Sequence, residues 1–200
     1  MNPFLSLLRA TEFAADKHKN QRRKDAAGTP YINHPIQVAH FLARAGVINR
    51  DVLIAALLHD TIEDTNTTFS EIQNAYGPTV AMIVKEVSDD KSLPKEVRKQ
   101  LQIEHAATIS TEAKLVKLAD KLSNISGLDS DPPKTWSQAE IDGYLCWAYA
   151  TVDAMKGTNA YLENELMEVF KRSPCYEIMI NPTALQARLE LYYQNIINSE

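Results

Sequence analysis

The 200-residue sequence contains only two cysteines, Cys146 and Cys175, and six glycines. Two cysteines cannot build a disulfide framework or a cysteine-type metal site, and a domain of this length does not need a crosslink. We therefore expect reduced thiols in a cytosolic protein. The sequence also lacks convincing strand-like alternation of apolar and polar residues, and this absence favours an all-α fold.

The sequence has no excess of positive charge and lacks long apolar runs as well. The net charge is −5, so nothing in the overall charge indicates nucleic acid or an anionic membrane as a partner. A polyanionic small-molecule substrate would need a local basic patch. Residues 1–8 are partly apolar, but Arg9 and Glu12 follow directly, so this stretch is too short for a secretion signal or a membrane span. The sequence does not indicate an oligomeric state.

Helical periodicity runs along the whole chain and predicts a single helical bundle of about ten helices. Two capping boxes, Thr68 with Glu71 and Ser137 with Glu140, mark helix starts. We expect residues 1–172 to form the main domain and residues 173–200 a C-terminal helical extension. The predicted helices cover residues 4–18, 35–43, 51–64, 69–76, 78–87, 94–107, 112–125, 138–155, 158–170 and 182–197.

The densest group of reactive side chains lies in residues 58–64, at the end of a helix that is otherwise apolar. His59 and Glu63 are four residues apart, as are Asp60 and Asp64, so we expect each pair on one side of the helix. Buried charges need neutralisation, and a divalent metal ion bound by imidazole and carboxylate would provide it. A solvated acidic loop after the helix is the structural alternative.

Two more residues could complete a metal site. His34 precedes Pro35 at the start of a predicted helix, and Asp120 lies on a strongly apolar helix, one turn before Asn124. Each has a simpler explanation. His34 could be a turn histidine bonded to the backbone, and Asp120 could pair with a lysine, Lys117 or Lys121, at the surface.

The order His34, His59-Asp60, Asp120 resembles the pattern of the HD metal-dependent phosphohydrolase superfamily. Longer segments resemble the hydrolase domain of RelA/SpoT proteins, most closely the small stand-alone hydrolases of the metazoan SpoT homologue type. The similarity covers roughly residues 8 to 172. The segments that carry it are residues 23–35, 55–65, 88–99 and 114–124.

This resemblance implies an HD-domain fold and Mn²⁺-dependent hydrolysis of guanosine 3′,5′-bis(diphosphate), ppGpp, or its pentaphosphate pppGpp. The 3′-pyrophosphate would be released, leaving GDP or GTP. The ligands of one Mn²⁺ ion would be His34, His59, Asp60 and Asp120. The acid/base pair acting on water would be Glu63 and Asp64. The nucleotide contacts would be Arg23, Lys24, Asn124 and Tyr144, and further phosphate-neutralising candidates are Lys91, Arg98 and Lys99.

The chain departs from the family pattern after Asn124. An arginine usually follows two residues later, where this chain has Ser126, and Ser123 replaces a commoner aromatic residue or histidine. These changes bear on nucleotide contacts near the end of this helix and leave the expected metal ligands intact.

Two other functions fit the same residues. One is an NADPH 2′-phosphatase using the same metal site, which the resemblance to metazoan-type hydrolases implies, and the other is a non-catalytic nucleotide sensor. The Glu63-Asp64 pair argues against a sensor, which has no need to activate water. Tyr144 and Trp147 could form a base-stacking wall, although aromatic residues at this spacing are more often core. Trp136 has no assignable role.

Overall fold

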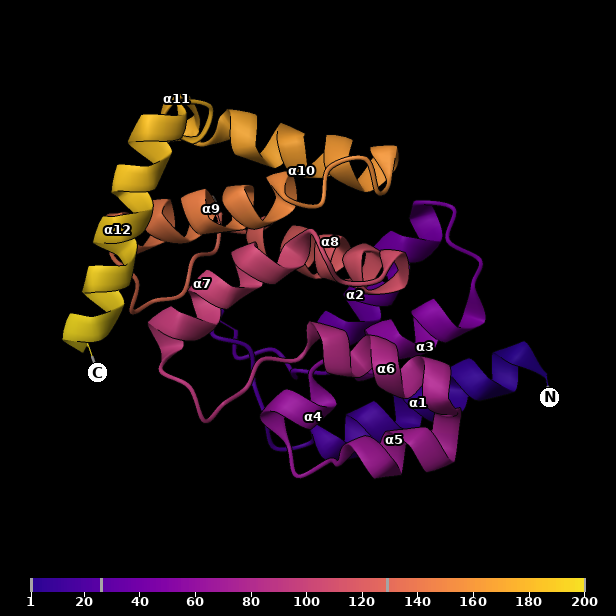
Figure 1. The fold of residues 1–200 in the computed structure, drawn as a ribbon. Coiled ribbons are helices and arrows are strands. Elements are labelled where there is room, and N and C mark those ends of the chain that lie inside the picture. The colour runs from indigo at the N-terminus through magenta and orange to yellow at the C-terminus, as the bar shows by residue number, and fades with distance from the viewer. Residues whose placement is uncertain (1, 26, 129, 200) are drawn as a thin grey trace.

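The computed structural model describes residues 2–25, 27–128 and 130–199, and these form a bundle of α-helices (Figure 1). Each of the ten predicted helices is present. The described residues contain no β-strand, only an isolated bridge between Arg22 and Pro30. The helices are α1 (Pro3–Lys17), α2 (Asn33–Arg44), α3 (Arg50–Leu58), α4 (Thr61–Asp64), α5 (Phe69–Tyr76), α6 (Pro78–Val87), α7 (Lys95–Ala106), α8 (Thr111–Ile125), α9 (Gln138–Asp153), α10 (Ala160–Arg172), α11 (Tyr176–Met179) and α12 (Pro182–Ser199).

Local sequence explains where several of these helices begin. Both predicted capping boxes are formed, at the starts of α5 and α9. Asn181 caps α12, because its Oδ1 accepts hydrogen bonds from the backbone amides of Thr183 and Ala184, both at 3.1 Å. Pro182 is the first residue of that helix, where its missing N–H costs no hydrogen bond.

The prediction of one continuous helix through His59 and Asp64 is wrong. α3 ends at Leu58, and the four-residue helix α4 begins at Thr61. Side chains compete with the backbone at this break: the Thr61 hydroxyl donates to the Leu58 carbonyl at 2.6 Å, and His59 Nδ1 lies 2.8 Å from the Ala56 carbonyl. The break separates His59 and Asp60 from Glu63 and Asp64.

The centre of the bundle is α3, as its uniformly apolar sequence predicts. It packs against α1, α2, α6 and α8, and nearly all of its residues after Asp51 are buried. α8 lies against α2, α6 and α10 as well. The end of α3, the start of α2 and the middle of α8 therefore meet inside the protein.

The C-terminal segment packs onto this bundle. α12, yellow in Figure 1, lies against α9 and α7, and it buries Leu189, Tyr192 and Ile196. The division into a domain of residues 1–172 and an extension of residues 173–200 stays a prediction. Within the described ranges, no helix has the length and apolar character needed to cross a membrane.

We expect Leu42→Ala to lower the free energy of unfolding by about 2–5 kcal/mol. Leu42 is fully buried on α2, the helix that packs on both α3 and α8, so truncation leaves a cavity. Ile48→Ala is the matched control, because Ile48 is 93% exposed and its loss should change stability by no more than about 0.5 kcal/mol. Urea unfolding measures both, and equal midpoints for the two variants would contradict the assigned core.

Candidate metal centre and active site

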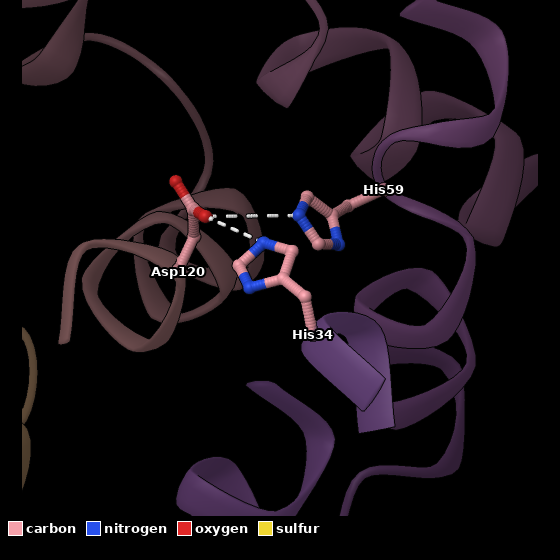
Figure 2. Close-up of side chains that lie close together, drawn as sticks. All are labelled: His34, His59 and Asp120. Carbon is pink, nitrogen blue, oxygen red and sulfur yellow. Dashed lines mark ion pairs between the residues drawn. The ribbon is translucent and has the colours of Figure 1, made fainter. Parts of the chain in front are cut away.

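Three segments that are distant in sequence place His34, His59 and Asp120 together (Figure 2). His34 lies in the first turn of α2, His59 directly follows α3, and Asp120 lies on α8. One ligand atom from each lies within 4.8 Å of the others. Asp120 Oδ1 is 3.1 Å from His34 Nε2 and 3.7 Å from His59 Nε2. These three predicted ligands therefore form a group that could hold a metal ion.

The fourth predicted ligand, Asp60, faces the same two imidazoles. Its Oδ2 lies 3.0 Å from His59 Nε2 and 3.5 Å from His34 Nε2. The Tyr31 hydroxyl donates a hydrogen bond to that oxygen at 2.7 Å. Tyr31 thereby fixes the direction in which the carboxylate points.

Asp120 is held by neighbours on its own helix. Asn124 Nδ2 donates to Asp120 Oδ1 at 2.7 Å, and Lys121 Nζ lies 3.2 Å from Asp120 Oδ2. The expected lysine pairing exists, but Lys121 is only 3% exposed. The surface-aspartate alternative is therefore wrong. Asn124, predicted as a nucleotide contact, also orients Asp120.

The hydrogen bonds of the two imidazoles assign their tautomers. His59 Nδ1 faces the Ala56 carbonyl, which can only accept, so Nδ1 carries the hydrogen. His34 Nδ1 lies 2.8 Å from Ser123 Oγ, whose own hydrogen goes to Gln37 Oε1, so Nδ1 is again the donor. In the neutral rings both Nε2 lone pairs then face the carboxylates, which is the arrangement expected of metal ligands. The alternative of a backbone-bonded turn histidine at His34 is wrong.

The donor chemistry fits a divalent metal ion. His59 Nε2 is buried and makes no hydrogen bond within the described chain. Such a buried, unsatisfied nitrogen beside two carboxylates is what a cation would satisfy. Two imidazole nitrogens and two carboxylate oxygens suit several divalent transition metals.

Electrostatics keep the two carboxylates ionised. Burial raises the pKa of Asp120, but Lys121 and the histidines outweigh it and hold that pKa well below its usual range. Burial likewise raises the pKa of Asp60, and His59 more than offsets it. Burial disfavours the charged form of His59, yet Asp60 and Asp120 raise its pKa well above the usual value. A metal ion must displace that proton, so we expect metal affinity to fall at low pH.

Glu63 and Asp64 lie beside this cluster, in a cavity of about 310 Å³ that the four expected ligands also line. Glu63 Oε2 accepts a hydrogen bond from the Asp89 amide at 3.0 Å. Lys91 Nζ bridges the pair, at 3.3 Å from Glu63 Oε1 and 2.8 Å from Asp64 Oδ1. Burial raises the pKa of Glu63, and the Asp89 amide and Lys91 only partly oppose this. A carboxylate with a raised pKa is the better proton acceptor.

A wall of three lysines, two buried and one half-buried, lines the same cavity. It consists of Lys99, Lys117 and Lys121, of which we had expected only Lys99 to face phosphate. Burial, reinforced by the charge of Lys121, lowers the pKa of Lys117 to about 8 and that of Lys99 well below its usual value. The spacing could have shown this, because Lys117 and Lys121 share one helix face with Asp120 and Asn124.

The predicted nucleotide contacts surround a second, larger cavity of about 890 Å³ next to the first. Arg23, Lys24, Asn124 and Tyr144 all line it. Trp136, which had no role in the sequence interpretation, lines it too, with its ring centroid 5.1 Å from that of Tyr144. The structure thus adds an aromatic residue to this side of the site.

Trp147 belongs mainly to the core, as its spacing suggested. It is almost fully buried, and its indole N–H donates to the Lys99 carbonyl at 2.8 Å. Lys99 Nζ lies 3.4 Å from the centroid of the Trp147 ring, a cation–π contact. Trp147 therefore supports the lysine wall, while Tyr144 faces both cavities.

Comparison with known proteins decides the family. Residues 10–152 match the family described as HD domain. The chain belongs to the HD-domain family. It is 53% identical over 165 residues to the zebrafish (Danio rerio) protein named guanosine-3′,5′-bis(diphosphate) 3′-pyrophosphohydrolase MESH1, covering 82% of this chain and 92% of that one. It is 52% identical over 167 residues to the human (Homo sapiens) protein of the same name, with 83% and 93% covered.

A solved structure supports the same HD-domain assignment. It is described as a metazoan orthologue of SpoT that hydrolyses ppGpp and plays a role in starvation responses. The two chains are 48% identical with a TM-score of 0.82, covering 84% of this chain and 94% of the other. The expected HD-domain fold is therefore confirmed.

We expect Glu63→Gln to raise the melting temperature of the metal-free protein at pH 7. The pKa of Glu63 is raised in the folded state, so the Glu63 carboxyl group holds its proton more tightly in the folded protein than in the unfolded chain. The contribution of protonated Glu63 to the free energy of unfolding is fully present below the pKa of Glu63 in the unfolded chain, which is about 4. This contribution is lost as the pH rises through the higher pKa of Glu63 in the folded protein. Melting curves in chelator should differ at pH 7 and converge near pH 4. A lower melting temperature for Glu63→Gln at pH 7 would contradict this electrostatic assignment.

Proposed function

We propose that this protein hydrolyses ppGpp and pppGpp at the 3′-pyrophosphate, giving GDP or GTP and pyrophosphate, with one Mn²⁺ ion per chain. The observation that carries the proposal is the convergence of His34, His59, Asp60 and Asp120 in a cavity that also contains Glu63. The names of the similar proteins support the substrate. Manganese is the metal that the family resemblance implies and that the nitrogen and oxygen donors accept.

The proposed chemistry divides between the ion and the chain. His34, His59, Asp60 and Asp120 would hold Mn²⁺, which supplies a Lewis acid and a water of lowered pKa. Glu63 accepts the proton of the water that attacks the 3′-linked phosphorus, as its raised pKa favours. The bond from this phosphorus to the ribose 3′-oxygen breaks, and the proton then goes to that oxygen, which becomes the 3′-hydroxyl. Asp64 is the second member of the proposed acid/base pair, and Lys91 holds the two carboxylates in place because it bridges them.

The lysine wall supplies the charge that a pyrophosphate group requires. The chain is acidic overall, yet Lys99, Lys117 and Lys121 gather at the cavity that contains the expected metal ligands. Desolvation lowers the pKa of Lys99 and Lys117, and a polyphosphate beside them would favour their charged forms. Charge that develops on the phosphoryl oxygens while the bond from phosphorus to the ribose 3′-oxygen breaks would then be stabilised without solvent reorganisation.

The larger cavity suits the nucleoside and its 5′-phosphates. Tyr144 and Trp136 provide aromatic surface for a purine base, and Arg23 and Lys24 lie at the same cavity for phosphate or base contacts. We propose a small-molecule nucleotide as the ligand, in a protein of the cytosol, and assign no nucleic acid, membrane or protein partner.

The first test is turnover of ppGpp and NADPH side by side, with Mn²⁺ and with chelator. We expect Mn²⁺-dependent release of pyrophosphate from ppGpp. This activity should fall by a factor of at least ~10² in Asp120→Ala, because the substitution removes the proposed metal ligand that lies beside both histidines. Turnover of NADPH alone would keep the metal chemistry and reject the nucleotide assignment.

Glu63→Gln is the control that separates an enzyme from a nucleotide sensor. It preserves size and the acceptor for the Asp89 amide while removing the base. An enzyme should lose turnover and retain ppGpp binding. Absence of turnover in the wild type with any divalent metal, together with tight nucleotide binding, would favour the sensor.

We expect Lys99→Met to lower kcat/KM for ppGpp by about 10- to 100-fold, since hydrogen bonds to charged groups contribute roughly 1.5–3 kcal/mol. Methionine keeps an apolar stem of similar length against Trp147. Lys171→Met is the matched control, because Lys171 pairs with Glu168 on the surface of α10 and should leave kcat/KM unchanged. Equal values for both variants would remove the lysine wall from the mechanism.

A further inference from the structure

The C-terminal helix α12 rests on α9 at a point where α9 has no side chain. An ideal Cβ built on Gly143 would lie 2.6 Å from Tyr192 Cδ2 and 3.0 Å from its Cγ. Real Cβ atoms do not approach other atoms this closely, so the Tyr192 ring occupies the space that any other residue at position 143 would fill. Tyr192 is itself buried, at 8% exposure. The next residue after Gly143 is Tyr144, which faces both cavities.

The turn before α11 contacts the same stretch of α9. Cys175 is buried there, and its thiol donates to the Asp142 carbonyl across 3.9 Å. Cys146 of α9 lies close enough for each of the two thiols to shift the pKa of the other. Residues from the C-terminal segment thus touch α9 at Asp142, Gly143 and Cys146, on both sides of Tyr144 in the sequence.

α12 also packs against α7, the helix that carries Lys99. α7 and α9 are joined to each other by the hydrogen bond from Trp147 to the Lys99 carbonyl. Figure 1 shows α12 lying across both helices, away from α2 and α3, from which His34 and His59 come. No residue of α12 is among the described residues that line either cavity. Any influence of α12 on the site must therefore pass through α7 and α9.

We propose that residues 173–199 form a positioning element of the active site, in which Tyr192 packed on Gly143 fixes α9 so that Tyr144 contacts the nucleotide. This inference rests on the proposed nucleotide hydrolysis. The segment acts on the nucleotide and lysine side of the site and leaves undisturbed the expected metal ligands, which lie on α2, directly after α3 and on α8. Tyr192 is a positioning residue, because it acts through Tyr144 and touches no part of the substrate.

The experiment uses the full chain with Tyr192→Ala, Tyr192→Phe and the neighbouring control Leu191→Ala, whose side chain is 60% exposed. We expect Tyr192→Ala to raise KM for ppGpp by about tenfold or more, because small misplacements of a binding wall are costly. Its kcat and Mn²⁺ affinity should stay close to wild type. Tyr192→Phe keeps the ring and should behave as wild type, as should Leu191→Ala. An unchanged KM in a folded Tyr192→Ala protein would overturn the inference.

Gly143→Ala tests the contact between Tyr192 and Gly143 by a change on α9. The added methyl must displace Tyr192, so this variant should raise KM in the same way as Tyr192→Ala. In the Tyr192→Ala background the methyl has room, and Gly143→Ala should then have little further effect. Additive effects of the two substitutions on KM would contradict a direct contact between Gly143 and Tyr192. If Tyr192→Ala does not fold, Gly143→Ala alone decides, by a raised or an unchanged KM.

A ligand-free measurement separates this inference from the proposed function. The chain has two tryptophans, and both lie in the wall around Tyr144, with ring centroids 5.1 Å and 5.3 Å from it. Acrylamide should quench their fluorescence more strongly in Tyr192→Ala than in the wild type. If the wild type does not hydrolyse ppGpp, the proposed function fails, and equal quenching in the two proteins would overturn the positioning role independently.

Discussion

Two carboxylates buried against two imidazoles form the constraint on which the site depends. Asp60 and Asp120 carry like charges into the protein interior, and such charges are tolerated only where opposite charges or a cation neutralise them. The side chains of Tyr31, Asn124 and Lys121 bond to these oxygens, while Ala56 and Ser123 turn both Nε2 atoms toward them. The helices α2, α3 and α8 must therefore pack in one relative position for these buried charges to be neutralised.

The region around this cluster divides its charge between two sides. The expected ligands and Glu63 make one side acidic, and Lys99, Lys117 and Lys121 make the other basic. A metal ion is opposite in charge to the acidic side, and a polyphosphate group is opposite in charge to the basic side. Binding of the two would therefore offset the cost of burying the carboxylates and the lysines. This complementarity connects the HD-domain ligand set with a nucleotide substrate, although the chain as a whole is acidic.

Much of the fold follows from local sequence. The helix starts at α5, α9 and α12 were predictable because capping side chains satisfy amides within a few residues of themselves. The apolar sequence of α3 predicted its central place because a helix without a polar face must be surrounded. The break after Leu58 was not predictable from periodicity, since it depends on the Thr61 and His59 side chains competing for backbone carbonyls.

The sequence by itself determined the helical class, the order of the chemical groups and their resemblance to a known hydrolase domain, because these depend on residue type and spacing along the chain. Only the tertiary structure decided that Lys117 and Lys121 are buried in the site, that Trp136 lies beside Tyr144, and that Tyr192 rests on Gly143. Each of these depends on which helices pack together. A side chain's burial and partners are set by the neighbouring helices, and local spacing does not specify those.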